Sequence, residues 1–149
     1  MKNYILKTQH TAEIAHYLRG HEGACQNIHG HSYLFILQVK GEELQEQGPE
    51  RGMVMDFSNV KKVFRNFIDS LDHSLMIEVD NQVEGIKEHY VDIKIGDLDV
   101  ATNKRVLTVN FRPTAENMSK IFAEYLIGQG LPVHSLEVYE TRTNSAVYM

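Results

Sequence analysis

The sequence contains one cysteine in 149 residues, so no disulfide can form within the chain. Cys25 is therefore a packed small side chain, a reactive thiol or a metal ligand. Basic runs are also missing: the 15 Lys and Arg residues are dispersed and the net charge is -5, which argues against nucleic acid or an anionic membrane as the main partner. No apolar run is long enough to cross a bilayer, and the opening MKNYILKTQH lacks the features of a signal peptide. We therefore expect a cytoplasmic protein.

The composition indicates a single domain over residues 1–149. With 42% hydrophobic and 23% charged residues, a chain of this length can bury a substantial core. Aromatic and β-branched residues in alternating patterns predict four strands, at 3–16, from His29 to about Lys40, at 133–142 and at 145–149. The last two strands are expected to form a short hairpin. Glycine-rich polar stretches predict loops at 17–28 and 41–52.

Two amphipathic helices interrupt these strands. The first is predicted in NVKKVFRNFIDSL, with Ser58 as its N-cap and its end close to Asp72. The second begins around residues 113–114 and stops at Gly128. Because the elements lack regular β-α-β alternation, we expect an α+β fold in which helices cover one face of an antiparallel sheet.

The motif CQNIHGH at residues 25–31 suggests a metal site. His29 and His31 are two residues apart in a predicted strand, so both imidazoles leave the same face. A third ligand must come from His10, His16 or His21, and His16 fits best because it ends the first strand. Neutral imidazoles favour zinc, and three of them leave a coordination position open to polarise a substrate oxygen or acidify water. The alternative is that His29 and His31 only form hydrogen bonds near a strand end.

The motif LDHS at residues 71–74 places Asp72 beside His73 at the predicted end of the first helix. A carboxylate near an imidazole fixes its orientation and raises its basicity, and such a histidine can take a proton from a thiol. Cys25 is the thiol available for that role. Taken singly, an Asp-His pair is more often a solvated helix end, and a lone cysteine is more often inert. Their coincidence with candidate zinc ligands indicates a site that moves protons beside a Lewis acid.

Glu140 is a candidate for binding a substrate. It alternates with Leu136 and Val138 on one predicted strand face, where an unpaired carboxylate is costly to bury. A planar heterocycle that presents an amino group and a ring NH would supply two parallel hydrogen bonds. The alternative is a strand-end residue exposed to water. Glu116, in PTAEN, is a weaker candidate, because a glutamate in the first helical turn mostly serves the helix dipole.

Together these motifs resemble the 6-pyruvoyl-tetrahydropterin synthase and 6-carboxytetrahydropterin synthase family. The resemblance covers about residues 4–73 and 110–149, and its pieces occur in the order CQNIHGH with His16 upstream, GMVMDF, LDH, PTAEN and YET. It implies the tunnelling fold, in which a four-stranded antiparallel sheet carries two helices on one side. It also implies trimers that form a β-barrel and commonly stack into hexamers, with sites at subunit interfaces.

The resemblance implies a role for each candidate residue. The zinc ligands would be three histidines, His16, His29 and His31. The proton relay would consist of Cys25, Asp72 and His73. The pterin would be bound by Glu140, which also counts as catalytic, together with Thr114 and Glu116.

The spacing within the first motif distinguishes branches of the family. Three residues separate Cys25 from His29, as in bacterial 6-carboxytetrahydropterin synthases of the queuosine pathway. Gln26 stands where variants acting on dihydroneopterin in folate synthesis usually carry a glutamate. The resemblance thus implies conversion of 7,8-dihydroneopterin triphosphate to 6-carboxy-5,6,7,8-tetrahydropterin, acetaldehyde and triphosphate. The alternatives are the pyruvoyl-forming and folate-pathway reactions, a different zinc enzyme such as a hydrolase, and a metal-binding scaffold without activity.

One segment departs from the family pattern. The stretch between His73 and Pro113 is longer than the family leads us to expect, and it contains two alternating apolar runs around GDLDVATNK. We expect an added β-hairpin at about residues 85–111. Such a hairpin could affect the mouth of the site, the subunit contacts or the substrate range.

Overall fold

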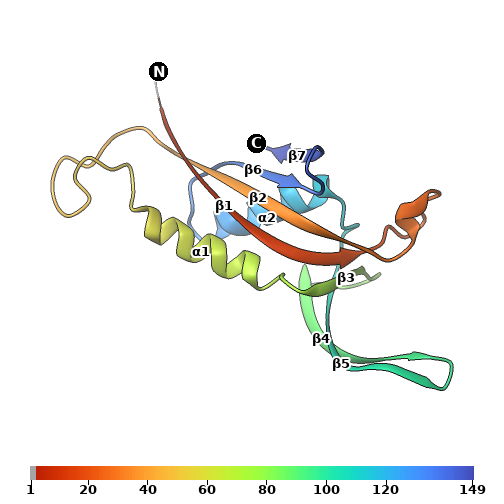
Figure 1. The fold of residues 1–149 in the computed structure, drawn as a ribbon. Helices are drawn as coiled ribbons and strands as arrows, with labels where there is room; N and C mark the ends of the chain where they lie inside the picture. The colour runs from red at the N-terminus through yellow and green to blue at the C-terminus, as the bar shows by residue number, and fades with distance from the viewer. Residues whose placement is uncertain (1–2) are drawn as a thin grey trace.

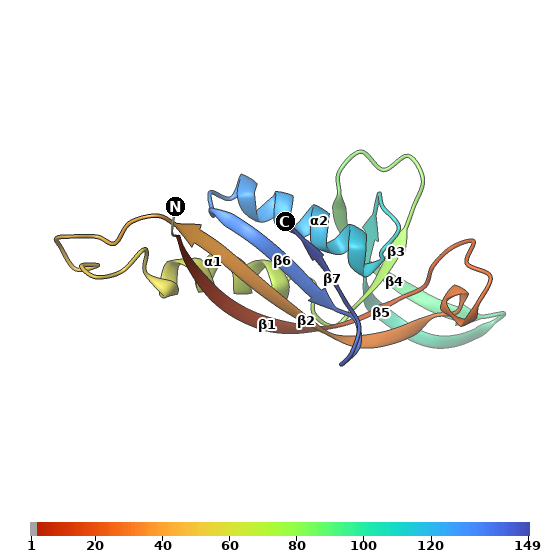
Figure 2. The ribbon, with the colours of Figure 1, turned by 90° about the horizontal axis from the view of Figure 1, so that it is seen from above.

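The computed structural model describes residues 3–149 as one curved sheet with two helices on the same face (Figures 1 and 2). The elements follow one another along the chain as β1 Tyr4–His16, a short 3-10 helix Ala24–Gln26, β2 His29–Gly41, α1 Phe57–Asp69, β3 Ser74–Glu78, β4 Ile86–Ile95, β5 Leu98–Val109, α2 Ala115–Gly128, β6 Val133–Tyr139 and β7 Ser145–Tyr148. The predicted α+β class, the two helices and the terminal hairpin are therefore confirmed.

The sheet is larger than the sequence patterns suggested. It has seven strands in the order β4-β5-β3-β1-β2-β6-β7, so the prediction of a four-stranded sheet was wrong. Strands β1, β2, β6 and β7 are paired antiparallel, but β3 runs parallel to both β1 and β5. The parallel pairing arises because α1 carries the chain back along the sheet, so that β3 starts in the direction of β1 (Figure 1).

The core lies between the sheet and the helices. Alternate residues of β2, namely Tyr33, Phe35 and Leu37, are fully buried, as the period of a strand with one covered face requires. Helix α1 contributes Phe64 and Ile68 from its apolar stripe to the same cluster. One continuous core therefore holds the sheet and both helices together.

The first helix is capped by a different residue from the one expected. Asp56, not Ser58, is the N-cap, and its carboxylate accepts a hydrogen bond from the backbone N–H of Ser58 at 2.8 Å. Hydrogen bonds from the hydroxyl and N–H of Ser58 lower the pKa of Asp56. Both residue types are good caps, and Asp56 prevails because its backbone is extended while Ser58 is already helical. Helix α2 begins as predicted, with Thr114 as the N-cap.

The predicted hairpin is confirmed as β4 and β5, which pair antiparallel through a tight turn at Gly96. It projects from the body of the molecule (Figure 1), and β4 is exposed from Lys87 to Ile95. Its base joins the main sheet through the parallel pairing of β5 with β3. No helix among residues 3–149 is long and apolar enough to cross a membrane.

Packing of α1 on the sheet can be tested with two phenylalanines of that helix. Phe64 is fully buried, so Phe64→Ala should lower the free energy of unfolding by about 3–5 kcal/mol through lost burial and a cavity. Phe57→Ala, at a side chain that is 42% exposed, should cost less than about 1 kcal/mol. Urea denaturation of both variants measures the difference, and equal losses would contradict the described packing.

Candidate metal centre

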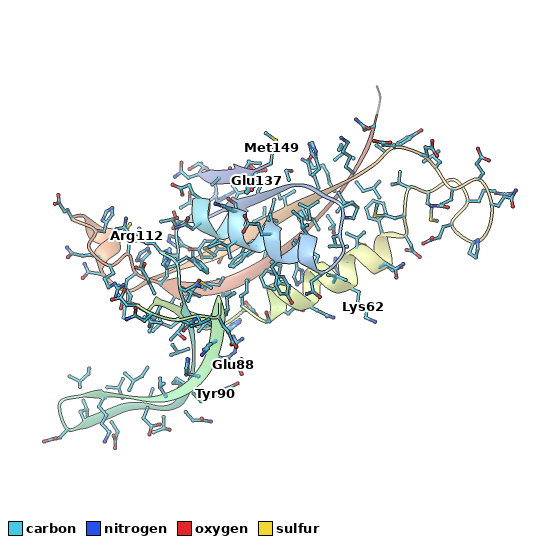
Figure 3. All side chains as sticks on the ribbon, turned by 180° about the vertical axis from the view of Figure 1, so that it is seen from behind. Lys62, Glu88, Tyr90, Arg112, Glu137 and Met149 are labelled. Atoms are coloured by element: carbon cyan, nitrogen blue, oxygen red, sulfur yellow. The ribbon has the colours of Figure 1, made fainter. Side chains whose placement is uncertain are left out.

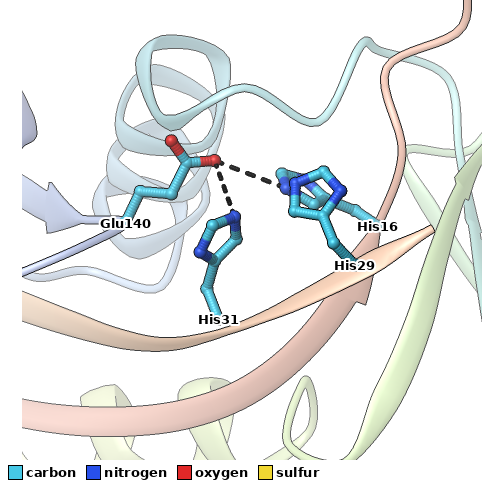
Figure 4. A group of neighbouring side chains, drawn as sticks. All are labelled: His16, His29, His31 and Glu140. Carbon is cyan, nitrogen blue, oxygen red and sulfur yellow. Dashed lines mark ion pairs between the residues drawn. The ribbon is translucent and has the colours of Figure 1, made fainter. Parts of the chain in front are cut away.

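Three imidazoles and one carboxylate converge at one end of the sheet (Figure 4). The β1–β2 register pairs His16 with His29 and Ile14 with His31, so the three rings leave the core-facing side together. Their centroids lie 4.6 to 5.2 Å apart. One ligand atom from each of His16, His29, His31 and Glu140 lies within 4.8 Å of every other. The sequence-based choice of His16 as the third histidine agrees with this geometry.

The other two candidate histidines have different partners. His10 lies on the same strand as His16, but its Nε2 contacts the Asp69 carboxylate at 2.7 Å. His21 accepts a hydrogen bond at Nδ1 from the backbone N–H of Gly23. Neither belongs to the metal-ligating group found among residues 3–149.

Backbone carbonyls orient two of the rings. His16 donates from Nδ1 to the carbonyl of Pro113 at 2.8 Å, and His29 donates from Nδ1 to the carbonyl of Asn27 at 2.7 Å. Each hydrogen bond sets the proton on Nδ1 and leaves Nε2 unprotonated, with a lone pair that can bind a metal. Such outer contacts are the usual way in which proteins fix the tautomer of a metal-binding histidine.

The third ring carries a buried atom without a hydrogen bond. Within the described part of the chain, Nε2 of His31 is buried and has no hydrogen-bond partner. The Oε1 atom of Glu140 lies 3.4 Å from it and 3.3 Å from Nε2 of His16, as the dashed lines in Figure 4 show. A buried nitrogen without a hydrogen bond is costly, and a metal ion in the centre of the group would satisfy it.

The electrostatic environment favours the neutral form of two of the histidines. Burial lowers the pKa of His16 and also that of His31, and the neighbouring imidazole of His29 acts in the same direction on both. The nearby Tyr33 phenol is fully buried, and its pKa is raised first by burial and then by the charge of Glu140. Neutral imidazoles with free Nε2 atoms suit zinc, so the residues present fit the expected ion.

Glu140 lies closer to the histidines than the sequence indicated. It stands one residue beyond β6, where its N–H bonds to the carbonyl of Asn144. The β2–β6 register pairs Leu34 with Tyr139, so Glu140 comes next to Tyr33 and reaches the histidine group. Strand alternation alone could show which way the side chain points, but not which strand lies beside it. Glu140 can therefore act as a fourth ligand or as an anchor for a molecule bound at the metal.

Cys25 lies in the short 3-10 helix that connects the ends of β1 and β2, and it is half-buried. Its backbone carbonyl accepts a hydrogen bond from the N–H of Leu18 at 2.7 Å, which closes the loop. After burial and Glu140, Cys25 also contributes to the raised pKa of the buried Tyr33 phenol. Cys25 is not among the metal-ligating group of residues 3–149.

Asp72 and His73 are hydrogen-bonded to each other, but neither belongs to the group of His16, His29, His31 and Glu140. They follow α1, which ends at Asp69, and Asp72 Oδ2 lies 2.8 Å from His73 Nδ1. The second carboxylate oxygen accepts the backbone N–H of Glu13, and this bond, followed by His73, lowers the pKa of Asp72. Among residues 3–149, no hydrogen bond or ion pair links the pair to Cys25. The side chain of His73 is 80% exposed.

The region of the second helix N-terminus touches the site through its backbone. Thr114 caps α2 by accepting the N–H of Asn117, and Glu116 is exposed in the first turn. The direct contact with the histidines comes from the carbonyl of Pro113. The sequence motif PTAEN points to Thr114 and Glu116. The contact made by Pro113 cannot be recognised in the sequence, because it uses a main-chain carbonyl that every residue has.

Comparison with known proteins identifies relatives that match this chain over most of their length. The chain is 31% identical over 147 residues to a 6-carboxy-5,6,7,8-tetrahydropterin synthase of Haemophilus influenzae, with 97% of this chain and 98% of the relative covered. A protein of the same name from Synechocystis is 32% identical, with 97% and 92% covered. The solved 6-pyruvoyl tetrahydropterin synthase of Plasmodium falciparum has a similar fold, with a TM-score of 0.68 at 19% identity, over 98% of this chain and 96% of that one. The model of the 6-pyruvoyl tetrahydropterin synthase family matches residues 5–149, and the chain therefore belongs to that family.

Proposed function

We propose that this chain is a zinc-dependent 6-carboxytetrahydropterin synthase. It converts 7,8-dihydroneopterin triphosphate to 6-carboxy-5,6,7,8-tetrahydropterin, acetaldehyde and triphosphate, a step towards 7-deazaguanine precursors of queuosine. The observation that carries the proposal is the group of three histidines and Glu140, in which the buried Nε2 of His31 has no hydrogen bond among residues 3–149. Support for the substrate comes from the names of the relatives in Haemophilus influenzae and Synechocystis.

His16, His29 and His31 are the residues that hold zinc in this proposal. When bound, zinc supplies Lewis acidity to the side-chain oxygens of the pterin and so acidifies the adjacent C–H. The carbonyls of Pro113 and Asn27 keep two of the three rings in the ligating orientation. The charge of the Glu140 carboxylate partly balances that of a divalent ion.

Cys25, Asp72 and His73 move the protons. Asp72 accepts a hydrogen bond from Nδ1–H of His73, which leaves Nε2 of the exposed ring to receive or deliver a proton. Because no hydrogen bond or ion pair among residues 3–149 joins the pair to Cys25, the complete relay in this proposal uses a neighbouring copy to bring His73 towards the thiol. A trimer or hexamer with sites between subunits meets this need, and the edge strands β4 and β7 are available for pairing.

Glu140 anchors the pterin. Its Oε1 faces the histidines, so the carboxylate can accept the amino group and ring NH of the heterocycle next to the metal. Thr114 and Glu116 complete the pterin contacts from the start of α2. The pyruvoyl-forming reaction is the second candidate, because the matching family model bears that name.

Metal content tests the ligand set. Purified protein should carry about one zinc per chain, and His31→Ala should lose most of it because a ligand is removed. His10→Ala is the matched control, since His10 lies on β1 but is bonded to Asp69. Elemental analysis measures both. A His31→Ala protein with wild-type zinc would show that the metal is held elsewhere.

The reaction itself is tested by its products. Incubation of the zinc-loaded protein with 7,8-dihydroneopterin triphosphate should yield 6-carboxy-5,6,7,8-tetrahydropterin and acetaldehyde. Mass spectrometry separates this product from the pyruvoyl and aldehyde products of the alternative reactions. Unchanged substrate would favour a metal-binding scaffold, and a pyruvoyl product would replace the proposed activity with the second candidate.

The role of the thiol is tested by a small substitution. Cys25→Ala should lower kcat by about a hundredfold or more while zinc content persists, because the proton carrier is lost but no ligand is. The neighbouring Gln26→Ala, at an exposed side chain, is the control for changes in the loop. Steady-state kinetics with zinc-replete enzyme decides, and near-full activity of Cys25→Ala would exclude the thiol from catalysis.

A further inference from the structure

Arg105 connects the projecting hairpin with the turn that carries Asp72 and His73. Its Nη1 donates to the carbonyl of Asp72 at 2.9 Å, and its Nη2 donates to the carbonyl of Ser70. Its Nε donates to the carboxylate of Glu88 at 2.7 Å, across the β4–β5 ladder. Glu88 lies where the hairpin leaves the body of the molecule (Figure 3). One guanidinium thus fastens the turn to the base of the hairpin.

The turn has a backbone conformation that needs support. His73 has a φ of 55°, in the left-handed region that residues other than glycine rarely adopt. On one side it is fixed by β1: the N–H of His73 donates to the carbonyl of Glu13, and the N–H of Glu13 donates to the Asp72 carboxylate, both at 2.7 Å. On the other side, Arg105 donates a hydrogen bond to the carbonyl of Asp72. Among residues 3–149, no other side chain hydrogen-bonds to the backbone of Asp72. The strained position is therefore held from two strands.

The orientation of the His73 ring depends on this turn. The ring is 80% exposed, and its one side-chain partner among the described residues is Asp72. It borders a pocket of about 450 Å³, which Glu13 of β1 and Lys104 of β5 also line. With so little packing around it, the ring has a defined direction only while Asp72 is held in place.

Arg105 acts on this turn through geometry. Its donors meet the carbonyls of Ser70 and Asp72, whereas the Asp72 carboxylate is bound by the N–H of Glu13 and by His73. The lowered pKa of Asp72 is explained by those two partners. Removing Arg105 therefore frees the backbone of the turn without taking away the partners that keep Asp72 ionised.

We infer that Arg105, held by Glu88, is a positioning residue that keeps Asp72 and His73 in the orientation needed for proton transfer. This inference rests on the proposed function, in which His73 belongs to the relay. It gives the hairpin β4–β5 a part in the reaction: its base supplies the donor that holds the relay histidine, and its tip is not needed for that role.

Four variants test the inference. Arg105→Ala removes all three contacts, and Arg105→Lys offers one ammonium group that cannot bond both carbonyls and Glu88 together. Glu88→Gln keeps an acceptor for Arg105 Nε. Lys94→Ala is the matched control, because Lys94 forms an ion pair with Asp99 on the same hairpin but away from the turn.

The kinetic readout separates positioning from folding. Arg105→Ala should lower kcat at least about tenfold with KM and zinc content unchanged, because a displaced proton carrier slows chemistry and not binding. Arg105→Lys should lie between it and the wild type, and Glu88→Gln and Lys94→Ala should remain near the wild type. A kcat for Arg105→Ala equal to that of Lys94→Ala would overturn the inference.

A second readout needs no substrate. In nitrogen-15 NMR of the neutral ring, His73 of the wild type should be protonated at Nδ1, as its bond to Asp72 requires, and Arg105→Ala or Arg105→Lys should shift it towards a mixture of tautomers. An unchanged tautomer in a folded variant would overturn the inference. If the wild type makes no pterin product while the tautomer responds to Arg105, the proposed function fails and the structural role of Arg105 stands.

Discussion

The antiparallel ladder between β1 and β2 is the interaction on which the site depends. Both strands are 13 residues long, and their register sets His16 opposite His29 and Ile14 opposite His31. Because side chains alternate with a period of two, a slip of one residue on β2 would turn His29 and His31 away from His16. Burial of Tyr33 and Phe35 on the same face opposes such a slip, since it would expose both rings to water. Core packing and metal geometry therefore require the same register.

The candidate metal centre places polar groups at the end of that core. His16 is 1% exposed and sits next to Tyr33, so its ring is held by the carbonyl of Pro113 on one side and packed by the phenol on the other. His31 is less buried, yet its Nε2 has no hydrogen bond among the described residues. Buried ligands arranged in this way lower the folding stability of the metal-free protein. A bound metal would raise that stability again by satisfying the buried nitrogens.

The two parts of the proposed site are held by different elements. The histidines and Glu140 come from β1, β2 and the end of β6, whereas Asp72 lies in the turn between α1 and β3 and is bound by the backbone of Glu13. The hairpin adds a further constraint, because Arg105 ties this turn to β4 and β5. The arrangement agrees with the proposal of a relay that is completed by another copy, and it connects the hairpin with the position of His73.

The sequence by itself determined the features that depend on local periodicity. The spacing of His29 and His31 requires one strand face, the apolar stripes define α1 and α2, and the alternating runs around GDLDVATNK define the hairpin. The tertiary structure alone decided the features that join distant segments. His16 meets a carbonyl 97 residues away at Pro113, Glu140 reaches the histidines through the β2–β6 register, and β3 enters the sheet parallel to β1. The physical reason is that a side-chain period fixes only which face a residue occupies, while the neighbour across that face is set by chain topology and by backbone groups that leave no pattern in the sequence.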